Sequence, residues 1–202
     1  LYHVPHSKIT QYSSERGSQV HPLATGAWRA PHANSNTFAR ESHIDIMAAK
    51  LGKDPVQFRL DNLSDQKMIH VVEALRDTFG YTPAPAPSGR GIGMALGTDA
   101  GTWVAVMVEV QVDESSGEVQ PIRAVVSQDM GLVVNPQGSI IQAEGCVTMG
   151  MGYALTEDIE FRGGDVISQN FDTYQLPLFS WVPKAIETVL LDRQDQPPQG
   201  GG

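Results

Sequence analysis

The sequence predicts an α+β fold in which a helical N-terminal part precedes a mixed sheet with packed helices. Apolar residues have helical spacing between Asn34 and Gly80, whereas valines alternate with other residues from Val104 to Val112. A segment with three prolines, residues 82–88, separates the two patterns. We therefore expect two parts, residues 1–82 and residues 83–202, in a chain long enough to bury a core.

Three helices are predicted in the N-terminal part, because each has an apolar stripe or an end signal in the expected place. Asp54 and Pro55 open the second helix in the cap-then-proline order that helix starts favour. The first helix should begin at Asn34 or Ser35, bury one stripe and end at Gly52. The apolar stripe of the first helix consists of Ile44, Met47, Ala48 and Leu51. The second helix should end at Asn62. The third should run from Lys67 to Thr78 and be closed by Gly80.

The alternating valines are the strongest strand signal in the chain. Residues 113–117 should form a turn, and residues 118–127 should return as the hairpin partner. The glycines at positions 89, 91, 93 and 97 resemble a phosphate-binding loop at first sight. Such a loop must lead from a strand into a helix, whereas these glycines lead into the valine strand. We therefore interpret them as a flexible entry to that strand.

One further helix and three further strand regions are predicted. Asn135 and Pro136 open a helix that should run to about Leu155. Strands are expected near residues 158–161 and 185–191, and residues 1–23 alternate loosely, as a strand with loops does.

Composition excludes several classes of partner. The formal charge is −9 and no basic run occurs, which argues against binding to nucleic acid or to an anionic membrane surface. The six histidines form no metal-ligating pair, so no metal bound by protein ligands is expected. Cys146 is the single cysteine, which excludes an intrachain disulfide, and its apolar neighbours predict a buried position.

Glu41 and Asp45 lie four residues apart on one predicted helix. Paired carboxylates can do acid–base chemistry, but these two are not on an irregular loop. Like charges at this spacing need compensation, which Arg40 or Arg59 could supply. A structural ion pair is the favoured interpretation.

Three segments could bind a ligand. Arg29 lies in a proline-bounded loop, residues 26–31, just before a helix, where an arginine can bind an anionic or oxo group; an ordinary loop is the alternative. Gln142 has an amide that needs partners, and the helix glycines at 145, 150 and 152 predict close packing. The glycine run Gly200–Gly202 predicts a backbone that approaches something closely.

Taken in order along the chain, these segments resemble the molybdenum hydroxylases of the xanthine dehydrogenase and aldehyde oxidase family. Within that family they are most similar to the molybdopterin-binding large subunits of the isoquinoline 1-oxidoreductase and bacterial aldehyde dehydrogenase type. The resemblance rests on residues 26–31 (Gly-Ala-Trp-Arg-Ala-Pro), 41–45, 54–59 with 62–63, 108–110, 129–131, 135–136, 142–145 and 170–174, and on the closing segment rich in proline and glycine.

The resemblance implies a molybdenum cofactor-binding fold and a set of cofactor contacts. Trp28 and Arg29, with the backbone of Ala27 and Ala30, would lie near the oxo and sulfido ligands of molybdenum. Gln142 matches a glutamine that hydrogen-bonds the cofactor. Cofactor contact is also expected at Gly200 and Gly201. The metal is then held by molybdopterin, expected in its cytosine dinucleotide form, and not by protein ligands.

The activity implied by the resemblance is hydroxylation of N-heterocycles or aldehydes with water as the oxygen source. The expected partners are the remainder of the same large subunit, an iron–sulfur small subunit or haem electron acceptor, and a small-molecule substrate. The family's catalytic base is a glutamate that would follow Gly202, and another cofactor segment would precede Leu1. This stretch alone therefore contains no catalytic residue and is expected to be inactive and to hold cofactor weakly or not at all.

Two other functions remain open at this point. A non-catalytic scaffold or interaction domain could keep the fold and lack the site. A stand-alone small-molecule binding domain would need a closed pocket within these residues. Unpartnered core faces also predict self-association as a dimer or aggregate. Localisation is left open.

Overall fold

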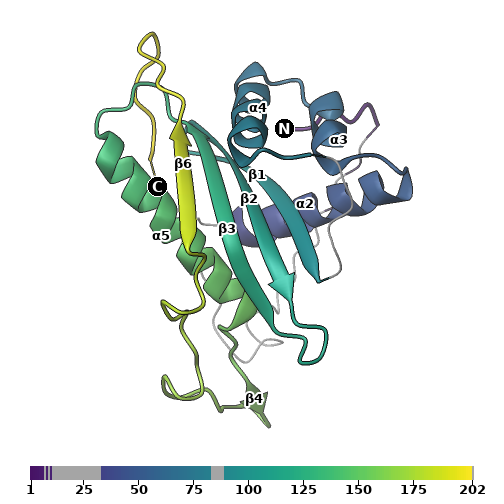
Figure 1. Cartoon of the computed structure of the whole chain (residues 1–202), viewed down its shortest axis with the longest axis vertical. Coiled ribbons are helices and arrows are strands. Elements are labelled where there is room, and N and C mark those ends of the chain that lie inside the picture. Colours follow the sequence, from purple (N-terminus) through teal and green to yellow (C-terminus); the bar gives the residue numbers. More distant parts are fainter. Residues whose placement is uncertain (7, 9, 11–32, 83–88, 202) are drawn as a thin grey trace.

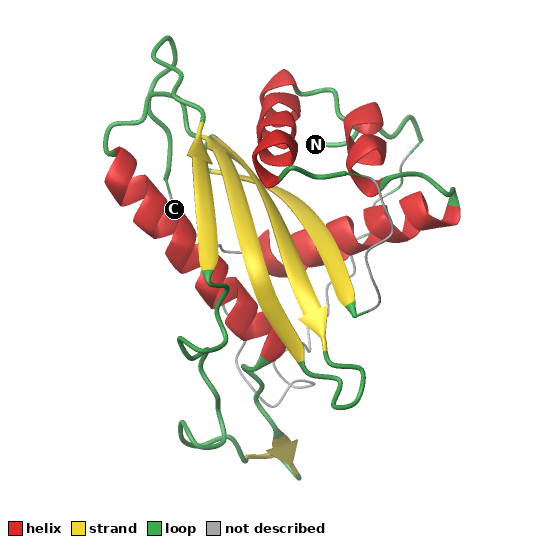
Figure 2. Ribbon diagram, in the orientation of Figure 1, coloured by secondary structure: helices red, strands yellow, loops and turns green. Residues whose placement is uncertain are grey.

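The computed structural model describes residues 1–6, 8, 10, 33–82 and 89–201. Its centre is a four-stranded sheet in the order β1-β2-β3-β6, with a separate small hairpin of β4 and β5. Figures 1 and 2 show the strands side by side, with helices on both sides of the sheet and an arm, residues 156–184, that extends beyond it. The predicted α+β class is confirmed, and the sheet is mixed because β3 and β6 pair in parallel.

The three N-terminal helices occur close to where their end signals placed them. They are α2 (Ala33–Lys50), α3 (Pro55–Asn62) and α4 (Gln66–Phe79). The Asp54 carboxylate accepts a hydrogen bond from the Gln57 amide at 2.8 Å, which caps α3 as the sequence indicates. Gly80 closes α4 in the left-handed conformation, with φ of 68°.

The glycine-rich segment that precedes the valines forms a full strand, so its interpretation as a flexible entry was wrong. β1 (Arg90–Asp99) pairs antiparallel with β2 (Thr102–Val112) along its whole length. Ala100 and Gly101, with φ of 47° and 81°, make the tight two-residue turn between the strands. Backbone hydrogen bonds to β2 need no side chains on β1, so the glycines do not prevent pairing.

The second hairpin and the last helix and strand agree with the sequence. β3 (Val119–Asp129) pairs antiparallel with β2, and α5 (Pro136–Leu155) connects onward to the arm. β6 (Ala185–Leu190) then returns beside β3. The strand expected near residues 158–161 is largely wrong, because the arm holds only the two-residue strands β4 (Phe161–Arg162) and β5 (Asp165–Val166), among exposed apolar side chains.

The hydrophobic core lies between α4 and one face of the sheet. Alternation in β2 directs Ala105 and Met107 to this face, where they pack with Val71 and Leu75 of α4. The intervening valines face the opposite side, beneath α5. α2 packs against the edge strand β1, and its first turn reaches the α5 side of the sheet. Within the described ranges, no helix combines the length and apolar character that crossing a bilayer requires.

Arg59 is the centre of a buried polar network that ties α2, α3 and β1 together. Its guanidinium donates to Glu41 Oε2 at 3.1 Å, to Asp45 Oδ1 at 2.6 Å and to the Met94 carbonyl at 3.0 Å. Arg40 also donates to Glu41, at 2.8 Å. The expected structural pairing of the two carboxylates with arginine is therefore confirmed, and both carboxylates are engaged in holding the fold.

Tyr2 joins this network and gives it a pH dependence. Its hydroxyl donates to Glu41 Oε2 at 2.8 Å, and burial together with the charge of Glu41 raises the pKa of the Tyr2 phenol. Unfolded tyrosine loses its proton near pH 10, whereas the folded phenol keeps it. The stability that Tyr2 contributes is therefore present below about pH 10 and is lost as the pH rises further.

We expect Tyr2→Phe to make the free energy of unfolding depend less steeply on pH between about 9 and 11. Urea titrations of the purified protein at several pH values in this range measure that slope. An identical slope in the wild-type protein and in Tyr2→Phe would contradict the prediction.

Candidate functional site

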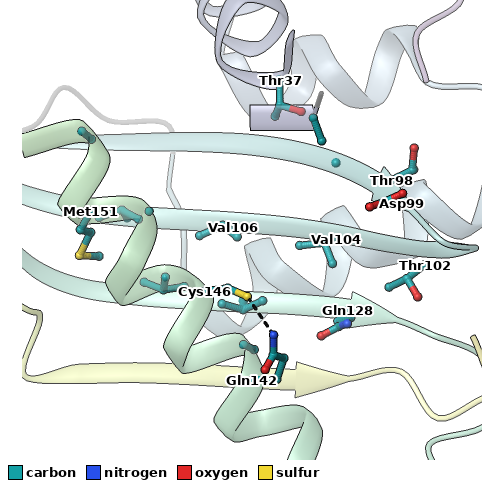
Figure 3. Close-up of a pocket in the computed structure, with 18 of the residues that line it drawn as sticks. Thr37, Thr98, Asp99, Thr102, Val104, Val106, Gln128, Gln142, Cys146 and Met151 are labelled. Atoms are coloured by element: carbon teal, nitrogen blue, oxygen red, sulfur yellow. Dashed lines mark hydrogen bonds between the residues drawn. The ribbon is translucent and has the colours of Figure 1, made fainter. Parts of the chain in front are cut away.

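An apolar cavity of about 560 Å³ lies between α5 and the valine face of the sheet. Figure 3 shows α5 passing over this face, with Val104 and Val106 of β2 pointing toward it and Met151 of α5 on the facing side. The cavity is open to the surface, and it borders the start of α2 as well. Its apolar lining consists of Val104, Val106, Val108, Val110, Pro121 and Val126 from the sheet, and Ala143, Val147, Met151, Ala154 and Leu155 from α5.

One end of the cavity is polar. Gln128, Gln142 and Thr102 line it, together with Thr37, Thr98 and Asp99 (Figure 3). Gln128 is 5% exposed, and no described residue forms a hydrogen bond with its side-chain amide. The Gln128 amide lines the cavity, so its donors and acceptor are available to a ligand with hydrogen-bonding groups at this end.

Gln142, which the sequence singled out, lies at this polar end on the second turn of α5. Its side chain is exposed, and Nε2 lies 3.6 Å from Cys146 Sγ. Cys146 itself is exposed at the cavity, so its predicted burial was wrong. The cavity keeps α5 from closing onto the sheet at this position, which leaves the thiol accessible.

The C-terminal glycines approach the protein as closely as the sequence indicated. Gly201 lines the cavity, and Gly200 donates its N–H to the Ala100 carbonyl at 3.1 Å. The Thr102 hydroxyl donates to the Gly200 carbonyl. A Cβ on Gly200 would lie 2.7 Å from Ala100 Cβ, and one on Gly201 would lie 2.7 Å from Met130 Cε. Gly200 has no room for a side chain, because Ala100 Cβ is fixed to the backbone, whereas a side chain at Gly201 would need only the flexible Met130 to move.

The proline-bounded loop of residues 26–31 lies outside the described residues. It contains Ala27, Trp28, Arg29 and Ala30, and Gly202 also lies outside the described residues. Ala33 follows Ala30 by three positions in the sequence and lines the cavity.

Other candidates from the sequence have structural roles or none. Close packing was predicted at three glycines of α5 but holds at Gly152 alone, where an added Cβ would meet Glu157 and Pro177; Gly145 and Gly150 face open space. Within residues 1–6, 8, 10, 33–82 and 89–201, His, Cys, Asp and Glu form no group of three that could hold a metal ion.

Comparison with known proteins identifies the family of this fold. The molybdopterin cofactor-binding domain family matches residues 75–183, which include β1, β2, β3, α5 and nearly all of the arm. This chain belongs to that family. A nicotinate dehydrogenase chain of Pseudomonas putida is 34% identical over 198 residues, covering 90% of this chain and 17% of the relative. The beta chain of isoquinoline 1-oxidoreductase from Brevundimonas diminuta is 30% identical over 151 residues, covering 73% of this chain and 19% of the relative.

The fold of this molybdopterin cofactor-binding domain also has solved counterparts. The aldehyde oxidoreductase of Desulfovibrio gigas superposes with a TM-score of 0.74 at 14% identity, covering 87% of this chain and 37% of that chain. The molybdopterin cofactor-binding domain thus spans about a fifth of the length of the two curated relatives named above.

Sequence reasoning missed Gln128 and Thr102 as lining residues. A signal for Gln128 did exist, because it lies two positions after Val126 and therefore faces α5 beside valines. The same signal existed for Thr102, which lies two positions before Val104. Its contact with Gly200 could not be found in this way, because Gly200 is 98 residues away in the sequence.

Proposed function

We propose that this domain forms one wall of the molybdenum–molybdopterin site in the large catalytic subunit of an oxidoreductase. The observation that carries the proposal is convergence at one cavity. Gln142 on α5, Gly201 near the C-terminus and Ala33 at the start of α2 are far apart in the sequence, and all three line it. The first two are expected cofactor contacts, and the third closely follows the loop with Trp28 and Arg29.

The described residues fit the pterin part of this cofactor. The amide of Gln128, which has no partner among the described residues, and the amide of Gln142 offer donors and acceptors to a polar heterocycle edge. The valines give an apolar wall for a planar ring system. Gly200 keeps the backbone close, where a side chain would collide with Ala100, and Gly201 lines the cavity beside it. When bound, the molybdenum centre supplies the two-electron oxidation of the substrate.

The residues of this domain bind and orient the cofactor and do not transfer the proton. Asp99 is the carboxylate among the described residues of the cavity, and it accepts a hydrogen bond from the Ala100 amide at 2.9 Å in the turn. The proton-accepting glutamate is assigned to the position that follows Gly202. The 202 residues alone are therefore proposed to be inactive.

The reaction proposed for the whole subunit is hydroxylation of an N-heterocycle or an aldehyde with oxygen from water. Support comes from the relatives, whose names specify nicotinate, isoquinoline and aldehyde oxidation. The proposed cofactor form is the cytosine dinucleotide. The proposed partners are the remainder of the large subunit and an iron–sulfur or haem electron acceptor.

We expect replacement of both amides, Gln128→Leu with Gln142→Ala, to weaken pterin binding roughly thirtyfold, since two lost hydrogen bonds at about 1 kcal/mol each sum to about 2 kcal/mol. Molybdenum and pterin per subunit are measured after expression with molybdate. The matched control is Gln111→Ala, which removes an exposed glutamine at the far end of β2. Full pterin content in the double variant would refute the assigned site. A wild-type subunit without molybdenum would instead support a scaffold role.

Cys146 provides a second readout that does not depend on activity. Its exposed thiol lies at the cavity beside Gln142. If pterin occupies this end, alkylation of Cys146, followed by peptide mass spectrometry, is slower in the loaded subunit than in cofactor-free subunit. Equal rates would contradict occupation of the cavity.

A further inference from the structure

The segment that carries Gly200 and Gly201 is held against the body of the domain by a chain of contacts that includes Arg193. After β6, residues 191–201, here called the strap, run past the ends of β3 and β1. The Gln199 amide donates to the Met130 carbonyl at 2.8 Å, and the Gly200 amide donates to the Ala100 carbonyl at 3.1 Å. At the start of the strap the Leu191 amide donates to the Gln128 carbonyl at 2.9 Å, and the side chain of Arg193 adds a charged contact there.

Arg193 is the charged anchor of the strap. Its Nε donates to Asp129 Oδ2 at 3.1 Å, and its backbone N–H donates to the Gly131 carbonyl at 3.1 Å. Asp129 is the last residue of β3 and is fully buried. Its other oxygen, Oδ1, accepts from the Gly131 amide at 3.1 Å. The carboxylate therefore orients Arg193 and the β3–α5 connection at the same time.

His70 of α4 holds the outer side of the guanidinium. Its Nδ1 lies 2.9 Å from an Arg193 NH2 nitrogen. A guanidinium has donors and no acceptor, so Nδ1 accepts and the ring proton is on Nε2. Arg193 thus spans from a buried carboxylate on β3 to a ring on α4, and this restricts its rotamer.

We infer that Arg193, paired with Asp129, is a positioning residue that holds the glycine strap at the mouth of the cavity. This inference rests on the proposed function, because the strap matters only if Gly200 and Gly201 face the cofactor. Arg193 does not line the cavity, so it acts through the backbone of residues 196–201. A loosened strap would leave the core sheet intact and remove one side of the binding site.

The test compares Arg193→Met with Arg123→Met in the subunit that carries the domain. Arg123 is a matched control, because it also joins β3 to α4: it pairs with Glu187 at 2.7 Å and donates to the Phe79 carbonyl, but it lies far from the strap. We expect amide hydrogen exchange in residues 196–201 to be at least tenfold faster in Arg193→Met. Exchange in the β2–β3 hairpin should be unchanged, and the strap should keep its protection in Arg123→Met.

A second variant separates positioning from charge neutralisation. Arg193→Met leaves the Asp129 carboxylate buried without its cation, so we add Asp129→Asn, which removes that charge and retains an acceptor for Gly131. Continued fast exchange of the strap in the double variant supports positioning. The inference is overturned if the strap regains its protection from exchange in the double variant, or if Arg123→Met loses as much strap protection as Arg193→Met.

Pterin content distinguishes this inference from the function on which it rests. We expect the pterin content to fall in Arg193→Met and not in Arg123→Met. A wild-type subunit that contains no pterin would refute the proposed function, and the exchange comparison would still decide whether Arg193 holds the strap. Fast strap exchange with full pterin content would overturn the role of the strap at the cofactor.

Discussion

Replacing Arg59 with alanine should lower the free energy of unfolding by about 3–5 kcal/mol, the range measured when one partner of a buried ion pair is removed. The Arg59 side chain is fully buried and contacts Glu41, which is 3% exposed, and Asp45. It also donates to the carbonyls of Pro55 and Met94. Truncation leaves the Glu41 carboxylate with Arg40 and Tyr2 alone. It also removes the Arg59 donor from three carbonyls, those of Glu41, Pro55 and Met94. Urea denaturation of the purified protein measures the loss.

Arg76→Ala is the control for this prediction. Arg76 also lies on a helix and pairs with a carboxylate, Asp77, at 2.9 Å, but both side chains are exposed. Exposed pairs are worth at most about 1 kcal/mol, so this variant should be close to wild type. Similar losses in Arg59→Ala and Arg76→Ala would show that burial of the network contributes little to stability.

Gly131→Ala should destabilise the protein and displace the strap. Gly131 has φ of 72°, and a Cβ there would lie 2.1 Å from the Pro197 carbonyl oxygen. The left-handed conformation alone costs an alanine about 1–2 kcal/mol. Because the colliding atom is backbone, the strap must move as well, which adds about 1–3 kcal/mol. Urea denaturation and hydrogen exchange of residues 196–201 measure the two effects.

Gly117→Ala isolates the conformational part of that cost. Gly117 has φ of 74° in the β2–β3 turn, and nothing lies within 4 Å of an added Cβ. It should lose stability without any change in strap exchange. If Gly131→Ala and Gly117→Ala lose the same stability, the contact between Gly131 and the strap has no energetic weight.

The helices could be predicted because their signals are local. Asp54 and Pro55 open α3 and Gly80 closes α4, and each acts within one turn of its own position. The same holds for the valine strand, whose alternation arises because successive side chains point to opposite faces of the sheet, so that the valines share one face. The family could also be named from the sequence, because an ordered series of short motifs is specific where a single motif is not.

The remaining features depend on contacts between distant residues. The glycines of β1 show no strand pattern, and they form a strand because β2 offers its backbone hydrogen bonds. Cys146 looks buried in the sequence, but the cavity beneath α5 exposes it. The pairing of Arg193 with Asp129 joins residues 64 positions apart. No periodicity in either segment indicates it.

The parallel pairing of β3 with β6 also determines the order in which the cavity can be completed during folding. β1, β2 and β3 are joined by short turns, so their pairing closes small loops. Pairing of β6 with β3 closes a much longer loop, residues 130–184, which contains α5. Because the entropic cost of closing a loop rises with its length, we expect this pairing to form later. We therefore expect Gly200 and Gly201, which follow β6, to reach the cavity only after β1, β2 and β3 have paired, so that the cavity is open on that side until β6 docks.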